Sequence, residues 1–151
     1  GLGSAARKGG VHAVVIHESL TGNTAKAGRA IAAGLTAQGI TTRAFAITAI
    51  DYQALSDADL VIVGSWVDGL IVVGQRPGRL GRIRTMPALA GKRAVVYLTY
   101  AIDPGKALQK MSDAVAALGA EVLGGQLIRR DKLDEGVDDF VSRVLDVTAS
   151  T

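Results

Sequence analysis

Short apolar runs alternate along the chain with longer stretches whose apolar residues repeat with a helical period. Five of the runs are short and rich in β-branched residues, which predicts buried strands at 11–17, 40–47, 59–65, 92–99 and 120–128. The stretches between them predict helices at 23–38, 80–89 and 104–118, a last helix from Asp134, and a short turn or helix within 48–58. Continuous apolar strands that alternate with helices are typical of a parallel sheet covered on both faces. We therefore predict an α/β fold with a doubly wound sheet of five parallel strands.

Turn and cap residues refine the predicted helix boundaries. Gly39 and Gly119 follow two of the helical stretches and are expected to end them. Asp103 is the predicted cap of the helix at 104–118, with Pro104 in its first turn, and Asp134 is the predicted cap of the last helix.

The chain has 151 residues, which fits one domain, predicted over 11–149. Residues 1–10 are glycine-rich without an apolar stretch, so we expect a disordered tail or a remnant of cloning and no signal peptide. No apolar run approaches the roughly 20 residues of a membrane helix, so no membrane partner is expected. The absence of cysteine excludes disulfides, thiolate metal sites and thiol catalysis. A cytoplasmic location is the default expectation.

Ligands of open parallel sheets bind at the carboxyl ends of the strands, which here precede the loops 18–23, 65–80 and 99–104. The first loop joins a strand to a helix and carries three hydroxyl groups and a glycine, in Ser19, Leu20, Thr21, Gly22, Asn23 and Thr24. Free N–H groups at the start of the helix would complete an anion-binding cradle. The alternative is ordinary capping of the helix by Thr21 or Asn23. The loop lacks both the Gly-Lys-Ser/Thr of a P-loop and a three-glycine dinucleotide fingerprint.

The segment Ser19–Thr24 resembles the phosphate signature of flavodoxins, Thr/Ser-x-Thr-Gly-x-Thr, at every defined position. It also has the family's place between the first strand and the first helix, and the order of elements is similar over nearly all of 11–147. Because the fifth strand is uninterrupted, the chain looks like a short-chain flavodoxin. The resemblance implies the sheet order 2-1-3-4-5 and a bound FMN.

The resemblance also assigns roles in the other two loops. The second contributes Ser65, Trp66, Val67, Asp68 and Gly69 to the predicted FMN site. Trp66 matches the aromatic residue that packs against the flavin ring, and a peptide containing Gly69 would face the flavin. The third loop contributes Thr99, Tyr100 and Asp103, with Tyr100 in place of the second ring-stacking aromatic residue. The alternatives are a tryptophan of the core and a tyrosine on the surface.

A basic segment departs from the family pattern. The net charge is +3, yet Gly69–Arg93 holds six basic residues and no acid. We expect an acidic redox partner protein to dock near Arg76–Arg84, a nucleic acid being the less favoured partner. The alternative is a solvated surface loop whose arginines bind no partner. The apolar run Leu70–Val73 could serve an oligomer interface.

Three functions fit this sequence. The favoured one is an FMN-binding flavodoxin-like protein that transfers electrons. The second is an FMN-dependent NAD(P)H oxidoreductase with a small acceptor such as a quinone, whose nicotinamide phosphate would bind Arg76–Arg84. The third is an interaction module that keeps the fold without flavin. No nucleophile–base pair and no paired carboxylates are evident, so no catalytic residue is predicted.

Overall fold

The structure is a computed structural model that describes residues 12–68 and 76–149. The tail predicted at 1–10, Gly69 and the run Leu70–Val73 therefore lie outside the described residues. The described residues form one α/β unit with a single central sheet.

The sheet has the predicted parallel core. Its parallel strands are β1 (His12–His17), β2 (Thr41–Ala46), β3 (Leu60–Asp68), β5 (Arg93–Tyr100) and β6 (Glu121–Arg129). They lie in the order β2-β1-β3-β5-β6, which is 2-1-3-4-5 when the parallel strands are counted along the chain. The predicted fold class and sheet order are confirmed. The two-residue strand β4 (Arg76–Pro77) was not predicted and pairs antiparallel with the end of β3.

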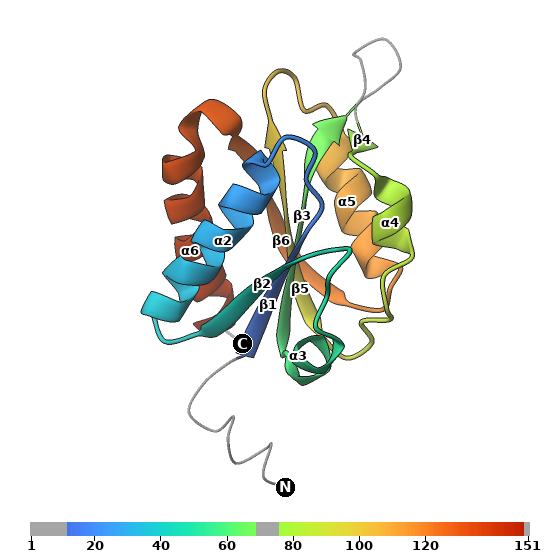
Figure 1. The fold of residues 1–151 in the computed structure, drawn as a ribbon, viewed down its shortest axis with the longest axis vertical. Helices are drawn as coiled ribbons and strands as arrows, with labels where there is room; N and C mark the ends of the chain where they lie inside the picture. The colour runs from blue at the N-terminus through green and yellow to red at the C-terminus, as the bar shows by residue number, and fades with distance from the viewer. Residues whose placement is uncertain (1–11, 69–75, 150–151) are drawn as a thin grey trace, which may run out of the picture.

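Helices cover both faces of the sheet (Figure 1). On one face lie α2 (Asn23–Ala37) and α6 (Leu133–Ala149), and on the other lie α3 (Tyr52–Asp57), α4 (Leu80–Arg84) and α5 (Ala107–Ala116). A single 3-10 turn, η1 (Arg130–Lys132), precedes α6. Among the described residues, no helix is both long and apolar enough to span a bilayer.

The three central strands β1, β3 and β5 are mostly apolar because both of their faces are buried. In β1, Val15 packs into the core beneath α2 and α6, whereas Val14 and Ile16 pack into the core beneath α3, α4 and α5. Successive side chains of a strand point to opposite faces of the sheet, so each core takes every second residue. This burial explains why the strands show no alternation of apolar and polar residues.

Three predicted helix boundaries were wrong, each for a local reason. Helix α4 ends at Arg84 rather than at 89, because Pro87 disfavours the helical conformation just before it. Helix α5 begins at Ala107, because Gly105 has a φ of 54° and Asp103 accepts the N–H of Gly105 at 2.9 Å instead of capping a helix. Helix α6 begins at Leu133, directly after η1, so the predicted cap Asp134 lies inside its first turn.

Tyr97 is the buried residue that joins α2 to the middle of the sheet. Its side chain is fully buried on β5, and its hydroxyl donates to the carbonyl of Thr24 at 2.8 Å. Burial raises the pKa of Tyr97, so the hydroxyl stays protonated and able to donate. The ring fits because Gly64 and Gly28 have no side chain. A Cβ on Gly64 would lie 2.0 Å from Tyr97 Cζ, and one on Gly28 would lie 2.8 Å from the hydroxyl oxygen.

We expect the substitution Gly64→Ala to destabilise the protein by about 1–3 kcal/mol or more, because the new methyl group overlaps the buried ring of Tyr97. Gly124→Ala is the matched control, since Gly124 also lies in a strand but a Cβ there meets nothing within 4 Å. Urea denaturation measures both changes in the free energy of unfolding. Equal stability of the two variants would contradict this account of Gly64.

Candidate functional site

The carboxyl ends of four parallel strands, with the residues that follow them, surround one hollow at the edge of the sheet. The hollow is lined by Leu20, Thr21, Asn23, Thr24, Trp66, Val67, Thr99, Tyr100, Ala101 and Arg130. The structure thus brings together side chains from all three loops that the sequence singled out. Its volume of about 120 Å³ is below the roughly 300–1,000 Å³ typical of pockets that enclose a whole ligand. A ligand the size of a nucleotide would therefore extend beyond the hollow.

The first loop ends in a helix whose first N–H groups have no side-chain cap. Helix α2 begins at Asn23, and its N-cap residue is Gly22 with a φ of 96°, a left-handed conformation that favours glycine. No side chain caps the helix. Ser19 Oγ accepts the N–H of Gly22 at 3.0 Å, and Asn23 Nδ2 donates to Thr21 Oγ1 at 3.3 Å, so both bonds shape the loop itself. The capping alternative for Thr21 and Asn23 is therefore wrong.

Three other hydroxyl groups of the predicted site hold the loops together. Thr24 Oγ1 lies 2.8 Å from Thr99 Oγ1, and both side chains are buried. Ser65 Oγ, also buried, donates to the carbonyl of Gly78 at 2.7 Å. These bonds join the first loop to the third, and the end of β3 to the chain after β4. Direct contacts of Ser65, Thr24 and Thr99 with a cofactor stay predictions.

Trp66 is half-buried at the end of β3, with its ring packed against the chain that returns through β4. The N–H of Gly78 donates to the carbonyl of Trp66 at 2.6 Å. A Cβ on Gly78 would lie 2.1 Å from Trp66 Cε2, so only glycine allows the ring to lie this close. The guanidinium carbon of Arg79 lies 5.7 Å from the centre of the ring, within reach of a cation–π interaction. Trp66 therefore has a fixed place in the wall of the hollow.

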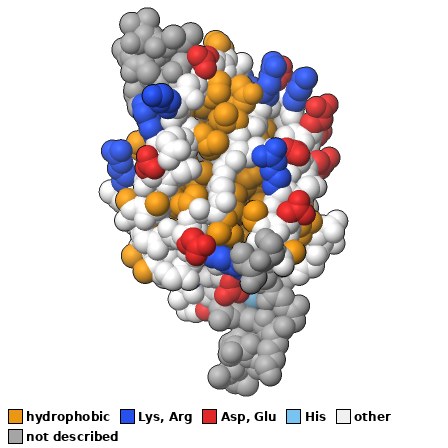
Figure 2. All heavy atoms as spheres, turned by 180° about the vertical axis from the view of Figure 1, so that it is seen from behind, with side chains coloured by type: hydrophobic (Ala, Val, Ile, Leu, Met, Phe, Trp, Pro, Cys, Tyr) orange, Lys and Arg blue, Asp and Glu red, His pale blue; other side chains and the backbone are white. Residues whose placement is uncertain are grey.

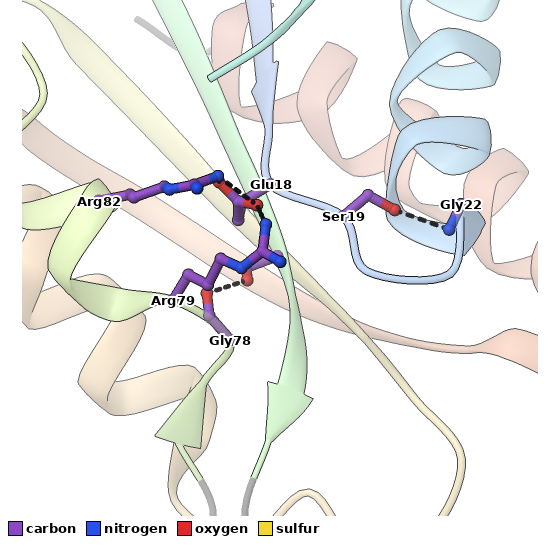
Figure 3. A network of polar contacts seen from close by, with 7 residues as sticks. Glu18, Ser19, Gly22, Gly78, Arg79 and Arg82 are labelled. Atoms are coloured by element: carbon purple, nitrogen blue, oxygen red, sulfur yellow. Dashed lines mark hydrogen bonds and ion pairs between the residues drawn. The ribbon is translucent and has the colours of Figure 1, made fainter. Parts of the chain in front are cut away.

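A buried carboxylate lies between the first loop and helix α4. Glu18 is 3% exposed and accepts hydrogen bonds from Arg79 at 2.7 Å and from Arg82 at 3.1 Å (Figure 3). From the sequence these arginines are expected to lack a neutralising acid, because none lies within their own segment. That view is corrected by the tertiary structure, in which the acid comes from the end of β1.

The neighbouring His17 is buried at the end of β1. A lone histidine at such a place usually has a structural role. Burial is the main cause that lowers the pKa of His17, and the positive charge of Arg29 lowers it further. No group of three or more His, Cys, Asp or Glu residues within 12–68 and 76–149 could hold a metal ion.

A second hollow lies along the edge of the sheet, between β6 and α6. It has a volume of about 320 Å³ and a mostly apolar lining that includes Val95, Gly125, Phe140, Val144 and Val147. Apolar side chains also gather in a band down the face of the molecule seen in Figure 2. The convergent hydroxyls, aromatic rings and uncapped helix end all belong to the first hollow, which is therefore the candidate site.

Comparison with known proteins identifies the family. A family model described as a flavodoxin domain matches residues 14–144, most of the chain. The chain belongs to the flavodoxin family. A search of curated proteins found no match.

Solved flavodoxins share the fold. The oxidised flavodoxin 1 of Bacillus cereus has a TM-score of 0.66 at 18% identity, over 89% of this chain and 97% of that one. A flavodoxin from the domain Archaea has a TM-score of 0.61 at 19% identity, over 88% and 98%. Rubredoxin oxygen:oxidoreductase from Desulfovibrio gigas has a TM-score of 0.61 at 18% identity, but this chain spans only 39% of it. At such identities the likeness establishes the fold alone.

Some of the predicted site residues of this flavodoxin-family protein line the hollow, and others do not. Asp103 is exposed, bonds to its own loop and does not line the hollow. Asp68 ends β3 and pairs in register with Arg76, while Gly69 lies outside the described residues. Sequence reasoning missed Arg130, which lines the hollow from η1. The rule that selected the other loops would have found it, because η1 directly follows the carboxyl end of the fifth parallel strand.

We expect Thr24→Val to destabilise this protein by about 1–3 kcal/mol, because it leaves the buried Thr99 hydroxyl without its partner. The double variant Thr24→Val/Thr99→Val should cost less than the sum of the two single changes, since it removes both polar groups. Chemical denaturation of the unaltered protein, the two single variants and the double variant measures the coupling energy between Thr24 and Thr99. Strict additivity would show that the bond contributes nothing to joining the two loops.

Proposed function

We propose that this protein binds FMN at the hollow formed by these loops and carries electrons between partner proteins. The observation that supports it best is the uncapped start of α2, which lies beside loop hydroxyls in the same hollow as two aromatic side chains. FMN combines a phosphate with a planar ring, and these are the two chemical groups that such a site suits. Proteins of the flavodoxin family generally bind FMN.

The donors of the first loop fit a phosphate. The first N–H groups of α2 lack intrahelical acceptors, and the positive end of the helix dipole favours an anion there. A Cβ on Gly22 would meet no atom within 4 Å, so the space above the backbone is open to a ligand. Thr21 and Arg130 line the same hollow and add a hydroxyl and a positive charge.

The two aromatic residues fit the flavin ring. Trp66 and Tyr100 are both half-buried, come from neighbouring strands and line the same hollow. Their exposed surface is available for stacking, and their backbone is held by the sheet. A bound flavin supplies the redox chemistry, while the protein supplies binding, orientation and electrostatics.

The ion pairs of the basic segment favour an electron carrier over the NAD(P)H oxidoreductase. A nicotinamide phosphate needs hydrogen-bond donors directed at it, and Arg79 and Arg82 direct donors to Glu18, whereas attraction of an acidic partner protein needs only net positive charge. An acidic redox partner near Arg76–Arg84 is part of the proposal. Its support is the exposed Arg84 on α4 and the excess of one positive charge that remains when two arginines share one carboxylate.

We expect Thr21→Val to weaken FMN binding about tenfold or more while leaving riboflavin binding nearly unchanged. A hydrogen bond to a charged group is worth roughly 1.5–3 kcal/mol, and riboflavin has no phosphate to receive it. Titration of apoprotein with each flavin measures the two dissociation constants. Thr48→Val, at an exposed threonine outside the hollow, is the control. Equal losses for the two flavins would refute the phosphate role, and no binding of either would refute the proposed function.

Trp66 is the only tryptophan, so its fluorescence reports on the site without ambiguity. We expect FMN to quench this emission strongly and its removal to restore the emission, because the ring would lie against the flavin. Titration followed by emission and by flavin absorbance gives both signals on one sample. FMN binding without any change in the emission of Trp66 would place the flavin away from the aromatic wall.

A further inference from the structure

Glu18 connects the loop before α2, through its backbone, to the chain after β4, through its side chain. It directly precedes Ser19, the first residue of the loop before α2, and its N–H donates to the carbonyl of Gly64 at 2.9 Å. Its carboxylate points to two arginines, Arg79 just before α4 and Arg82 within it (Figure 3). The residue thus lies where the first loop, the end of β3 and the chain after β4 come together.

The ion pairs with Arg79 and Arg82 compensate the negative charge of Glu18, which burial alone would make unfavourable. The Glu18 side chain is 3% exposed, whereas those of Arg79 and Arg82 are 42% and 48% exposed. A carboxylate removed from water is costly unless it is paired and hydrogen-bonded, and each oxygen of Glu18 has an arginine donor. Loss of the carboxylate would therefore take one hydrogen-bond partner from each of the two arginines.

Arg79 is the link between this carboxylate and Trp66. Within 12–68 and 76–149 it is the one non-glycine residue with a positive φ, at 51°, and it is the N-cap residue of α4. A left-handed conformation is unfavourable for a residue with a side chain, so other contacts must hold it. Arg79 has two such contacts, the bond to Glu18 and the position over the ring of Trp66. Its neighbour Gly78 packs against the same ring.

We infer that Glu18 is a positioning residue for the aromatic wall of the site. Its carboxylate fixes Arg79 over Trp66, and thereby holds the chain from Gly78 to Arg79 against the ring before any ligand arrives. The effect on flavin binding rests on the proposed function, whereas the fixing of Trp66 in the free protein does not. A preorganised wall costs less ordering when the ligand binds.

Glu18→Gln tests this inference in the free protein, because it keeps the size of the side chain but removes the charge that holds both arginines. We expect faster depolarisation of Trp66 fluorescence and a shifted emission maximum in the folded apoprotein. The matched control is Arg84→Gln, which removes a charge from the same helix outside the network. Far-ultraviolet circular dichroism establishes that each variant is folded. Unchanged emission and depolarisation in folded Glu18→Gln would overturn the inference, whether or not the protein binds flavin.

A double-mutant cycle of Glu18→Gln and Trp66→Phe tests whether Glu18 acts on flavin binding through Trp66. We expect Glu18→Gln to weaken riboflavin and FMN equally, on the order of three- to tenfold, because the ring is common to both flavins. In the Trp66→Phe background, the same change should have little further effect on either dissociation constant. Additive losses would show that Glu18 acts on the site by another route and would overturn the positioning role. A loss for FMN alone would do the same, because it would place the effect at the phosphate loop.

Discussion

The hydrogen bond from the Tyr97 hydroxyl to the carbonyl of Thr24 fixes the start of helix α2 against the centre of the sheet. The adjoining bond between Thr24 and Thr99 joins the same turn to the end of β5. The bond from Tyr97 depends on Gly28 and Gly64, whose missing side chains leave room for the tyrosine side chain. A helix end can bind an anion at a defined place only if it cannot shift, so this buried contact underlies the candidate site.

Electrostatics at the carboxyl edge of the sheet depend on how Glu18 is paired. An uncompensated carboxylate one residue before the loop would repel a phosphate and oppose the dipole of α2. Two arginines, Arg79 before α4 and Arg82 within it, turn this local negative charge into a group with one excess positive charge. The same contacts place Arg79 over Trp66. One ion-pair network thus compensates the buried carboxylate of Glu18 and fixes the aromatic wall.

The candidate site could be predicted from sequence where its residues are contiguous. Ser19–Thr24 lies in one short loop between a strand and a helix, so the pattern of hydroxyls and glycine carries its own structural context. A general rule for parallel sheets selected the loops that contain Trp66 and Tyr100, and the resemblance to flavodoxins singled out these two residues, which both line the hollow. Asp103 does not line the hollow, because a turn with Gly105 in a left-handed conformation delays the start of α5 and keeps the carboxylate in its own loop.

The sequence by itself determined the parallel sheet, its two helical layers and the loop that starts α2, because each follows from apolar periodicity or from neighbouring residues. The tertiary structure alone decided which hydroxyls face the hollow and which bond to one another. It also decided the partners of the arginines, since Glu18 and Arg79 are 61 residues apart along the chain. Pairings at that separation depend on how strands and helices pack, and no local pattern of residues encodes them.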